Sequence, residues 1–234
     1  MLKAASGGGG RGIRRIDDAT QMTGEIPIAR AEALAALNDD SVYLEKVVIN
    51  PKHVEVQILA DNHGKTLHLR TRDCSIQRRN QKLIEIAPSM IKNTKLLDEI
   101  CETTVKAAKA AHYLNAGTVE FLIDQDENYY FMEINTCVQV EHTVTEMITE
   151  IDIVRNQINI AFGKPLSLNQ DDVNVRGHTI EVRINAEDPK NYFMPEGGKR
   201  SLFIVQLVVS VCDSTDLFIR GISYQKSMTR CLSN

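Results

Sequence analysis

The chain has 234 residues, of which 43% are hydrophobic and 25% are charged, and its formal net charge is −4. This composition is typical of a globular protein with one sizeable core or two small ones, and it excludes disordered and collagen-like classes. Because the 27 basic and 31 acidic residues are mixed along the sequence, we expect a small-molecule or protein partner and no nucleic acid.

The cysteines show no CxxC pair and no partnering His spacing, so the sequence favours neither a zinc site nor a disulfide framework and fits a reducing cytosol. They are Cys74, Cys101, Cys137, Cys212 and Cys231. The longest apolar run, Leu202 to Cys212, is too short to span a bilayer. We therefore expect a soluble, cytoplasmic protein with no membrane partner.

The first predicted elements are a glycine loop and a short helix. Four glycines at residues 7–10 lie between Lys3 and Arg11. Such a loop brings backbone N–H groups close to phosphates, with Lys3 as a point charge, although a flexible linker has a similar composition. The Ala- and Leu-rich segment from Arg30 to Asn38 predicts a short helix.

A period of two follows between Val42 and Arg79 and predicts a hairpin with one polar face. Val54, Val56 and Ile58 lie on one face, and His53, Glu55 and Gln57 lie on the other. A turn at residues 61–64 separates this strand from a second one at Thr66 to Leu69.

The remaining periodicities predict helices and strands in alternation. Asn93 to Leu114 reads as an amphipathic helix, and residues 117–123 and 129–135 read as a second hairpin. One helix is expected from about Thr145 to Phe162, and a strand is expected from Thr179 to Asn185. The helix would carry Ile148, Ile151, Val154, Ile158 and Ala161 inward. The predicted fold is therefore α+β with a mainly antiparallel sheet.

Glu120 and Glu133 lie on the two strands of the second hairpin, and Asn135 shares the face of Glu133. Neighbouring carboxylates repel each other unless a cation lies between them. Mg²⁺ held by two carboxylates and nucleotide phosphates is a usual arrangement in phosphoryl chemistry, which makes a metal site one interpretation. Two solvated glutamates are the alternative.

The segment after this hairpin combines an amide, a carboxylate and an imidazole in Gln139, Val140, Glu141 and His142. A carboxylate there can act as a general base, although a capping loop with salt bridges explains the same residues. The donor-rich stretch at residues 72–82 suits an anionic substrate or, alternatively, a surface ion-pair network.

Six strings in this order resemble biotin carboxylases, which are ATP-grasp enzymes, from about Lys3 to Gly198. They are KAASGGGGRGIR, EKVVINPKHVEVQILAD, RDCSIQRRNQK, GTVEFL, FMEINTCVQVEHTVTEMITEIDIV and GHTIEVRINAEDP. The likeness is greatest to the biotin carboxylase subunit of acetyl-CoA carboxylase, although pyruvate and propionyl-CoA carboxylases share the strings. The large subunit of carbamoyl phosphate synthetase shares the paired glutamates but lacks RDCSIQRR and RINAEDP.

The resemblance implies an ATP-grasp core without the N-terminal α/β domain of the family and with a truncated C-terminal biotin carboxylase domain. Residues 1–47 correspond to part of a glycine-rich lid subdomain, residues 48–198 to the core, and residues 199–234 to a divergent tail. The implied reaction is ATP- and bicarbonate-dependent carboxylation of biotin on the biotin carboxyl carrier protein, the first half-reaction of acetyl-CoA carboxylase in fatty acid synthesis. Carboxyltransferase subunits are further implied partners, and a homodimer is compatible with the resemblance.

The resemblance also implies a set of ATP contacts. Phosphates would be covered by Lys3, Gly9 and Gly10, adenine would be held by Glu45, Lys46, Val48 and Leu122, and ribose and phosphate would be reached by His53, Gln77 and Asn80. Mg²⁺ or Mn²⁺ would be bound by Glu120, Glu133 and Asn135.

For bicarbonate, the resemblance implies a pocket of Lys82, Gln139, Val140 and Glu141. Glu141 would be the base, and Arg183 would steady the enolate of carrier-bound biotin. With Lys82 they form the implied catalytic set.

Three departures from the family string favour a second reading. Cys137 stands where the family has arginine, and losing one preorganised cation costs on the order of 10²–10³ in rate. Asn80 replaces a histidine but keeps a hydrogen-bond donor. Residues 201–234 are expected to lack the strands that finish the C-terminal domain, so the run from Leu202 to Val211 would be aggregation-prone if uncovered. A catalytically impaired nucleotide-binding protein is therefore the alternative function.

Overall fold

The computed structural model describes residues 1–6, 13–185, 187–195, 203–212 and 216–226. The chain divides into two compact units. The first contains residues 1–51 and 77–81, and the second contains residues 52–76 and 82–234. Each unit has its own sheet and its own helix or helices.

The first unit is a small antiparallel sheet with one helix. Its strands β1 (Leu2–Ala4), β2 (Ile13–Arg14) and β3 (Val42–Leu44) pair in the order β2-β1-β3. The 3-10 turn η1 (Ala19–Gln21) leads into helix α1 (Met22–Leu37). The helix ends at Asn38, which adopts a left-handed conformation with φ 56° and donates its N–H to Leu34.

The prediction of a helix from Arg30 to Asn38 was correct for the second half of α1 but wrong about its start. Pro27 lies inside the helix, where it cannot donate to the preceding turn. A proline at this place reads as a break in the sequence, and the structure accommodates it in the second turn.

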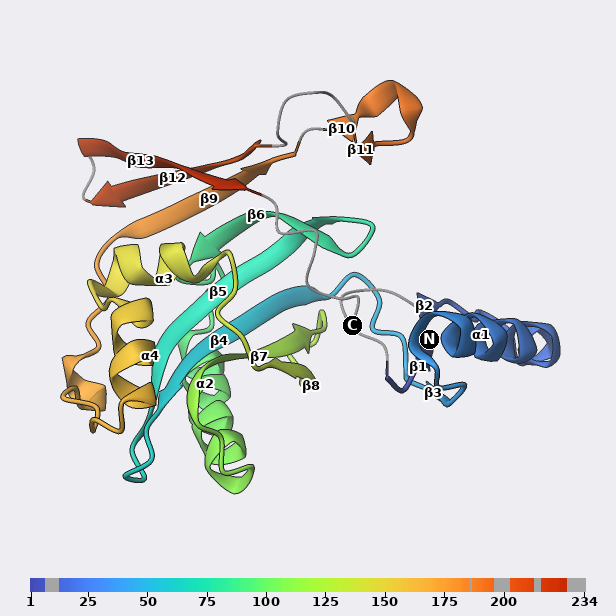
Figure 1. The fold of residues 1–234 in the computed structure, drawn as a ribbon, viewed down its shortest axis with the longest axis horizontal. Coiled ribbons are helices and arrows are strands. Elements are labelled where there is room, and N and C mark those ends of the chain that lie inside the picture. Colours follow the sequence, from blue (N-terminus) through green and yellow to red (C-terminus); the bar gives the residue numbers. More distant parts are fainter. Residues whose placement is uncertain (7–12, 186, 196–202, 213–215, 227–234) are drawn as a thin grey trace. The chain divides into compact units, whose positions relative to one another are not determined.

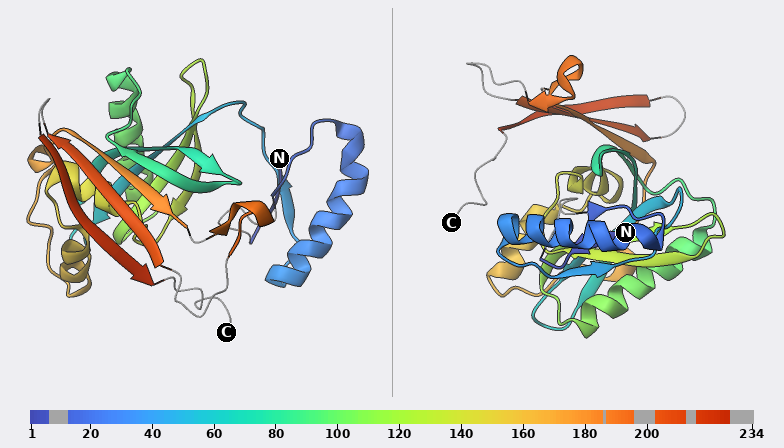
Figure 2. Two further views of the ribbon diagram at one scale, coloured as in Figure 1. Left: turned by 90° about the horizontal axis from the view of Figure 1, so that it is seen from above. Right: turned by 90° about the vertical axis from the view of Figure 1, so that its right-hand side faces the viewer.

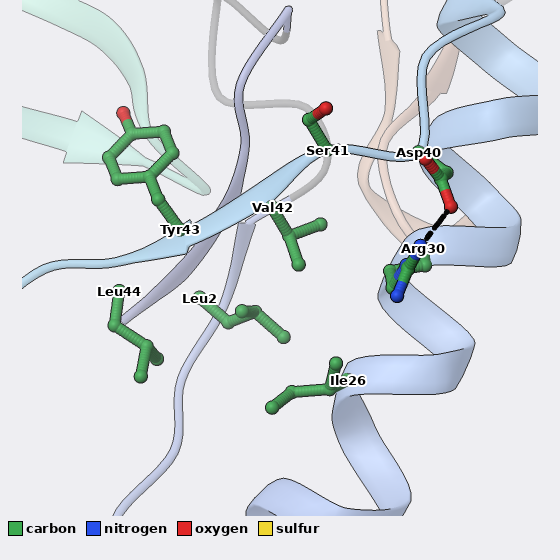
Figure 3. A pocket seen from close by; sticks show the side chains of 8 residues that line it. All are labelled: Leu2, Ile26, Arg30, Asp40, Ser41, Val42, Tyr43 and Leu44. Atoms are coloured by element: carbon green, nitrogen blue, oxygen red, sulfur yellow. Dashed lines mark hydrogen bonds and ion pairs between the residues drawn. The ribbon is translucent and has the colours of Figure 1, made fainter.

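A surface hollow of about 500 Å³ lies beside α1 and β3 in the first unit. Figure 3 draws its lining, in which the apolar side chains of Leu2, Ile26, Val42 and Leu44 are joined by those of Arg30, Asp40, Ser41 and Tyr43. Successive residues of a strand point to opposite faces, so Lys3 belongs to the other face of β1. The hollow is therefore separate from the position predicted to cover phosphates.

The second unit is built on an eight-stranded sheet with the order β13-β12-β9-β6-β5-β4-β7-β8 (Figure 1). Its strands are β4 (Lys52–Ala60), β5 (Thr66–Arg78), β6 (Gln81–Ala87), β7 (Asn115–Ile123), β8 (Tyr129–Asn135), β9 (His178–Ile184), β12 (Phe203–Cys212) and β13 (Asp216–Lys226). Its helices are α2 (Thr94–Ala110), α3 (His142–Thr149) and α4 (Ile153–Ala161). The 3-10 turns η2 (Gln170–Asp172) and η3 (Pro189–Asn191) and the short pair β10 (Glu187–Asp188) and β11 (Met194–Pro195) complete it. The α+β class, the antiparallel sheet and both predicted hairpins are confirmed.

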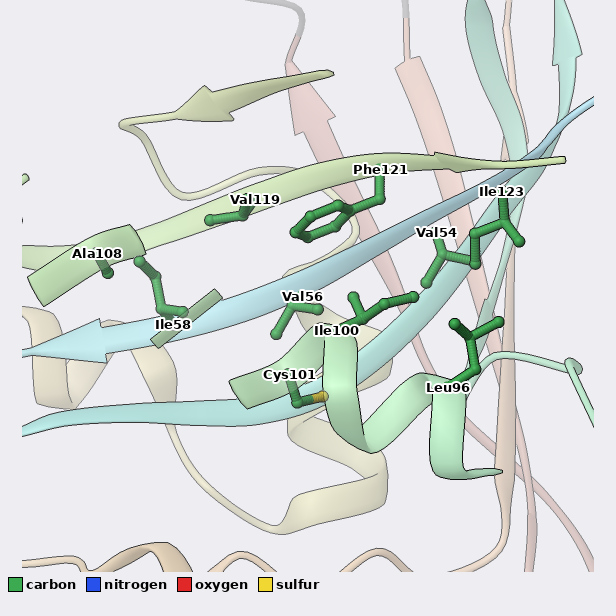
Figure 4. Close-up of a cluster of buried hydrophobic side chains, with 10 residues drawn as sticks. All are labelled: Val54, Val56, Ile58, Leu96, Ile100, Cys101, Ala108, Val119, Phe121 and Ile123. Carbon is green, nitrogen blue, oxygen red and sulfur yellow. The ribbon is translucent and has the colours of Figure 1, made fainter. Parts of the chain in front are cut away.

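Helix α2 covers one face of this sheet. Val54, Val56 and Ile58 of β4, with Val119, Phe121 and Ile123 of β7, pack against Leu96, Ile100, Cys101 and Ala108 of the helix (Figure 4). These six strand residues alternate along their strands, and α2 presents its apolar side at helical spacing. The helix begins with Asn93, whose side chain accepts a hydrogen bond from the N–H of Leu96.

The opposite face of the sheet carries α3 and α4. Ile151, Ile153 and Ile160 pack with Leu59 and Leu69, and Val144 and Ile148 of α3 pack on Ala87 of β6. The face of β4 that holds Glu55 and Gln57 is consequently buried, and both side chains are 0% exposed. The polar face of the predicted hairpin is an interior surface of the protein.

The single helix predicted from Thr145 to Phe162 is wrong, because the chain breaks between α3 and α4. Glu150 ends α3 in a left-handed conformation with φ 58°, and Asp152 begins α4 by accepting a hydrogen bond from the N–H of Arg155. Ile148 and Ile151 are buried as expected, whereas Val154, Ile158 and Ala161 of the second helix, which were expected to face inward, are exposed.

The tail also differs from expectation. Residues 203–212 and 216–226 form β12 and β13, so the expectation that residues 201–234 lack strands is wrong. β12 pairs with β9 from Val205 to Val211, and β13 pairs with β12 (Figures 1 and 2). The apolar run is therefore an inner strand with a neighbour on each side.

The first hairpin is longer than predicted. β5 continues to Arg78, and β6 was not expected at all. Arg79 and Asn80 join them with φ 52° and 62°, and two left-handed residues in a row are the requirement of a type I′ turn, where Asn is favoured. Among the described residues, no helix is long and apolar enough to cross a membrane.

Candidate active site

A row of charged side chains crosses the second unit at one level of its sheet. Arg72 on β5 is in register with Glu55 on β4, Glu55 with Glu120 on β7, and Glu120 with Glu133 on β8. Arg72, Glu55 and Glu120 are buried. Like charges on neighbouring strands repel each other, so the row requires cations or hydrogen-bond donors that compensate the carboxylates.

Arg72 supplies the first compensation. Its Nε atom lies 2.5 Å from Glu55 Oε1, and its Nη1 atom donates to Gln57 Oε1 at 2.9 Å and to Thr145 Oγ1 at 2.8 Å. Its Nη2 atom donates to Thr118 and Gln139. Burial lowers the pKa of Arg72, but the carboxylates of Glu55 and Glu141 raise it more, so the guanidinium stays charged. The stretch at residues 72–82 thus begins inside the protein, and Arg72 is not part of a surface ion-pair network.

Lys82 supplies the second compensation, at the centre of the site. Its Nζ atom contacts a carboxylate oxygen of Glu55, lies 2.9 Å from Glu120 Oε1 and lies 2.7 Å from Glu141 Oε1. Burial lowers the pKa of Lys82, whereas these three carboxylates raise it, and the net direction is upward. One ammonium ion therefore serves three carboxylates that come from separate segments.

Glu120 gathers most of the donors in the site. Its carboxylate accepts from Asn135 Nδ2 at 2.7 Å and from Gln139 Nε2 at 3.2 Å, and it lies 2.7 Å from Nε2 of His53. Burial raises the pKa of Glu120, but the hydrogen bond with His53 and the charge of Lys82 lower it to about 2. This side chain is ionised at neutral pH.

The hairpin brings the predicted metal ligands together at the level of the backbone. Glu120 and Glu133 are register partners, and Asn135 contacts Glu120 directly. Two carboxylates and an amide are the hard oxygen donors that Mg²⁺ prefers, so the donor set fits this ion. His53, Glu55 and Glu120 also offer ligand atoms within 4.8 Å of one another, although the ammonium of Lys82 already contacts both glutamates.

Glu141 and Arg183 form the other half of the site. Glu141 Oε2 accepts a hydrogen bond from Arg183 Nη2 at 2.6 Å, and Glu141 Oε1 faces Lys82. Burial and Glu55 raise the pKa of Glu141, but Lys82, Arg72 and Arg183 lower it, and the net direction is downward. Glu141 immediately precedes α3 and is 2% exposed, so it is a buried carboxylate held between two cations.

The remaining predicted site residues that the structure describes are distributed over both units. Lys3 and Glu45 of the first unit form an ion pair of 2.5 Å, while Lys46 and Val48 follow in an irregular segment. Gln77 and Asn80 belong to the tip of the β5–β6 hairpin, Leu122 is in register with His53, and Val140 lies in the turn before Glu141. Gly9 and Gly10 lie outside the described residues.

Cys137 lies in the loop between β8 and α3, and its side chain is exposed. It is a free thiol at the place where the family string has an arginine. The cations that contact Glu141 in the described part of the chain are Lys82 and Arg183.

The buried carboxylates Glu55, Glu85 and Glu181 were not singled out from the sequence as site residues, and Arg72 was noted only as part of the donor-rich stretch. Glu55 was assigned to a polar face, and that face was taken as the outside of a hairpin. The available signal was the density of charge itself, because the donor-rich stretch that includes Arg72 and Lys82 lies one strand away from the face that carries Glu55.

Comparisons with known proteins show the family to which the chain belongs. The fold and the row of buried carboxylates and cations define an ATP-grasp domain. A sequence model described as the carbamoyl-phosphate synthase L chain, ATP binding domain, matches residues 1–169, and the chain belongs to this family.

Its relatives narrow the resemblance further. The chain is 50% identical over 204 residues to a biotin carboxylase of Nostoc sp., covering 87% of this chain and 46% of the relative. It is 48% identical over 205 residues to the pyruvate carboxylase of Bacillus subtilis, covering 85% of this chain and 18% of the relative. The chain spans about half the length of the curated biotin carboxylases it matches.

Solved structures give the same result. A biotin carboxylase complex with an ATP compound from Campylobacter jejuni matches with a TM-score of 0.82 and 45% identity, covering 87% of this chain and 45% of that one. The biotin carboxylase domain dimer of 2-oxoglutarate carboxylase from Hydrogenobacter thermophilus matches with a TM-score of 0.81 and 44% identity, covering 96% and 50%. These likenesses confirm the resemblance to biotin carboxylases inferred from the sequence strings.

Proposed function

We propose that this chain catalyses the ATP- and bicarbonate-dependent carboxylation of biotin. The observation that carries this proposal is the chain of contacts from Lys82 through Glu141 to Arg183, with distances of 2.7 Å and 2.6 Å at the two oxygens of Glu141. These are the three residues that the resemblance implies for catalysis. Because Glu141 lies between two cations, an anionic substrate can bind here by replacing Glu141 as the partner of one of them.

Similar solved structures support the substrates. The Campylobacter jejuni biotin carboxylase was solved with an ATP compound, and the Hydrogenobacter thermophilus domain was solved with MgADP and bicarbonate. For this chain we assign ATP to Lys3, Gly9, Gly10, Glu45, Lys46, Val48, His53, Gln77, Asn80 and Leu122. Glu120, Glu133 and Asn135 would hold Mg²⁺, which when bound neutralises charge on the nucleotide phosphates.

Glu141 can act as a base only after one of its ion pairs, with Lys82 or Arg183, is broken. Its lowered pKa keeps it ionised, so it can accept a proton, but its two ion pairs also make it a weak acceptor. Bicarbonate bound at Lys82, Gln139 and Val140 would take over the contact with Lys82. Glu141 then accepts the bicarbonate proton while the oxygen of bicarbonate attacks the γ-phosphorus and ADP leaves.

The resulting carboxyphosphate breaks down to CO₂ and phosphate beside biotin. Arg183 lies on β9 next to Glu141, where its guanidinium can stabilise the negative charge that develops on the ureido oxygen of biotin. The phosphate released with CO₂ accepts the ureido N–H proton, and the ureido nitrogen attacks CO₂ to form carboxybiotin. In this assignment Lys82 stabilises bicarbonate, Arg183 stabilises the ureido oxygen of biotin, and Glu141 lies between them as the base.

The larger complex is proposed on the likeness to relatives alone. We favour the biotin carboxylase component of acetyl-CoA carboxylase in fatty acid synthesis, with biotin carboxyl carrier protein and carboxyltransferase as partners and a homodimer as the assembly. The pyruvate carboxylase of Bacillus subtilis and a mitochondrial methylcrotonoyl-CoA carboxylase subunit of Mus musculus have comparable identity, 48% in both cases. The biotin carboxylase part of such an enzyme is therefore the second version of this proposal.

One observation favours a different function, a protein that binds nucleotide without carboxylating biotin. Cys137 places an exposed thiol where the family string has an arginine, and a thiol cannot stabilise an anion as a guanidinium does. The loss of one such cation corresponds to a decrease on the order of 10²–10³ in rate.

The experiment compares biotin-dependent ATP hydrolysis, with bicarbonate and Mg²⁺, in the native chain and in Cys137→Arg. Clear turnover by the native chain supports the carboxylase function. Turnover by Cys137→Arg alone supports a binding protein disabled at one side chain. If neither turns over while both bind ATP with Mg²⁺ in a calorimeter, the carboxylase proposal for this chain is wrong.

A further inference from the structure

A pocket of about 530 Å³ opens on the face of the second unit that α2 covers. Thr71 of β5 lines it and is in register with Val56, which packs under α2. The next residue, Arg72, points to the other face of β5 and is in register with Glu55 of the candidate active site. The volume falls in the range of about 300–1,000 Å³ that is usual for small-molecule sites. One strand therefore separates this pocket from the candidate active site.

The walls of the pocket are apolar. They are formed by Met90 and Ile91 after β6, by Leu97 and Cys101 of α2, and by Val175 before β9. Cys101 also belongs to the core under α2 (Figure 4). Burial raises the pKa of Cys101 to about 12, although the charge of Arg70 opposes this rise, so the thiol is neutral. Such walls suit a ligand with an apolar body.

Two buried hydroxyl groups also line the pocket. Thr71 is 3% exposed and Ser89 is 6% exposed. Thr71 Oγ1 accepts from the N–H of Ser89 at 3.3 Å, and Ser89 Oγ accepts from the N–H of Ile91 at 3.5 Å. Each hydroxyl has a proton to donate as well, and within the described residues neither donates it to an acceptor. A ligand with acceptor oxygens would satisfy both donors.

Arg70 brings a positive charge to the same pocket. The register of β4 with β5 shifts by one residue beside it, and Arg70 has φ 68°, a left-handed conformation that glycine usually takes at such a bulge. Its Nη1 atom donates to Asp98 at 3.0 Å, but the Asp98 side chain is 62% exposed, so this ion pair is weak. Its Nε atom is buried and has no hydrogen-bond partner among the described residues. A strained backbone thus holds a guanidinium here whose donors are only partly used.

We propose that this pocket binds a small amphipathic carboxylate. The carboxylate accepts hydrogen bonds from the guanidinium of Arg70 and from the hydroxyls of Thr71 and Ser89, and the apolar chain lies along the walls. Arg70 and the exposed Lys92 oppose Asp98, the one carboxylate of the lining, so the pocket has an excess of positive charge. A neutral ligand would leave Arg70 without its counter-charge, and an anion without a chain would leave the walls in water.

The first test titrates the chain with octanoate in a calorimeter, with 1-octanol and acetate as the matched neutral and chainless probes. Octanoate should bind saturably at one site. Loss of a hydrogen bond to a charged group corresponds to about 10–100-fold in affinity, so 1-octanol should bind at least tenfold more weakly. Acetate lacks the chain and should give no saturable heat. Neither ATP nor biotin is needed, so the result is independent of turnover.

Three variants assign the polar contacts. Arg70→Asn keeps a residue that tolerates a left-handed backbone and removes the cation, and octanoate affinity should fall by about 10–100-fold while that for 1-octanol is unchanged. Thr71→Val removes one hydroxyl and should weaken octanoate by about 2–10-fold. Asp98→Asn removes the competing carboxylate and should strengthen octanoate binding. Arg176→Asn is the control, because this guanidinium is 67% exposed, pairs with Glu150 and lies outside the pocket lining.

The position of the ligand is checked by NMR of methionine methyl groups. Met90, one of seven methionines, lines the pocket, and its signal, assigned with Met90→Leu, should shift with the same half-saturation as the calorimetric titration. Saturable heat without a shift of Met90 would place the ligand on another surface and overturn the proposal. Absence of saturable octanoate binding, equal affinity for 1-octanol, or equal losses in Arg70→Asn and Arg176→Asn would each contradict it. If Arg70→Asn does not fold, unchanged affinity in Asp98→Asn contradicts the role of the guanidinium.

Discussion

The ammonium of Lys82 contacts Glu55, Glu120 and Glu141, so three buried carboxylates share this one cation. Lys82→Met removes the charge and retains much of the apolar stem. We expect the free energy of unfolding to fall by about 3–5 kcal/mol, because three buried carboxylates then exceed the cations that remain beside them, Arg72 and Arg183. Urea denaturation at pH 7 measures it.

The matched control is Lys106→Met, at an exposed ion pair of 3.9 Å with Glu102, where the change should stay within about 0.5 kcal/mol. The defect of Lys82→Met should shrink as the pH is lowered and the carboxylates bind protons. An equal effect of the two substitutions would show that Lys82 is not a central counter-charge.

Glu120 predicts an acid-dependent loss of stability. Its pKa is lowered from an unfolded value of about 4.5 to about 2, so its contribution is present above pH 4.5 and is lost as the pH falls toward 2. A difference of this size corresponds to about 3 kcal/mol. Unfolding of the native chain and of Glu120→Gln, measured without divalent cations from pH 6 to pH 3, should show a difference that decreases on acidification. A constant difference over this range would contradict the lowered pKa.

The close approach of Tyr113 to Gly117 predicts a steric effect of substitution at this glycine. A methyl group at this position would overlap the side chain of Tyr113, whose hydroxyl donates to the carbonyl of Ala116 at 3.0 Å. Gly117→Ala should therefore destabilise the protein by about 1–3 kcal/mol in denaturant titrations. Gly24→Ala in α1, where no atom lies within 4 Å of the new methyl group, should be neutral or should stabilise by up to about 1 kcal/mol.

At the scale of elements, the break between α3 and α4 depends on Asp152. Its Oδ1 atom accepts from the N–H of Arg155 at 2.7 Å and begins α4. Asp152→Ala should cost about 1 kcal/mol of unfolding free energy, whereas Asp152→Asn keeps an acceptor and should cost less. If the two variants have equal stability, the cap is not what starts the second helix.

This break also shows where the sequence stops being informative. The apolar residues from Ile148 to Ala161 continue at a spacing compatible with one helix. The left-handed conformation of Glu150, which ends α3, is visible in the backbone and not in this pattern. By contrast, α2 and the hairpin of β7 and β8 were predictable, because each has a clear period and a polar turn or cap at its end.

Most residues of the candidate site could be predicted from the sequence, but the ion pairs and the burial that join them could not. Glu120, Glu141 and Arg183 could be named from strings shared with a family, and the hairpin pairing of Glu120 with Glu133 followed from the turn between them. Glu55 and Glu85 lie on strands whose second face is covered by a helix from elsewhere in the chain. Their burial is a tertiary property, so a pattern of alternation could only place them on a polar face.

At the scale of the whole molecule, the pairing of β9 with β12 predicts how the sheet edge behaves. A chain that ends at residue 198 would leave the backbone groups of β9 that face β12 without partners, and an open edge of this kind favours association. We expect self-association of that variant in sedimentation velocity experiments. A chain that ends at Lys226 keeps both strands and should sediment as the native chain does; association of both variants alike would assign the effect to the last residues.

The buried guanidinium of Arg72 links five side chains from four places: Glu55 and Gln57 on β4, Thr118 on β7, Gln139 in the loop before α3, and Thr145 on α3. None of these segments can separate from β5 without leaving a charged group in the interior with donors unmatched. Partial opening is therefore as unfavourable as opening the whole centre of the sheet. Amide hydrogens of β4, β7 and α3 should exchange with a single common opening free energy, so the centre of this unit unfolds cooperatively as one block.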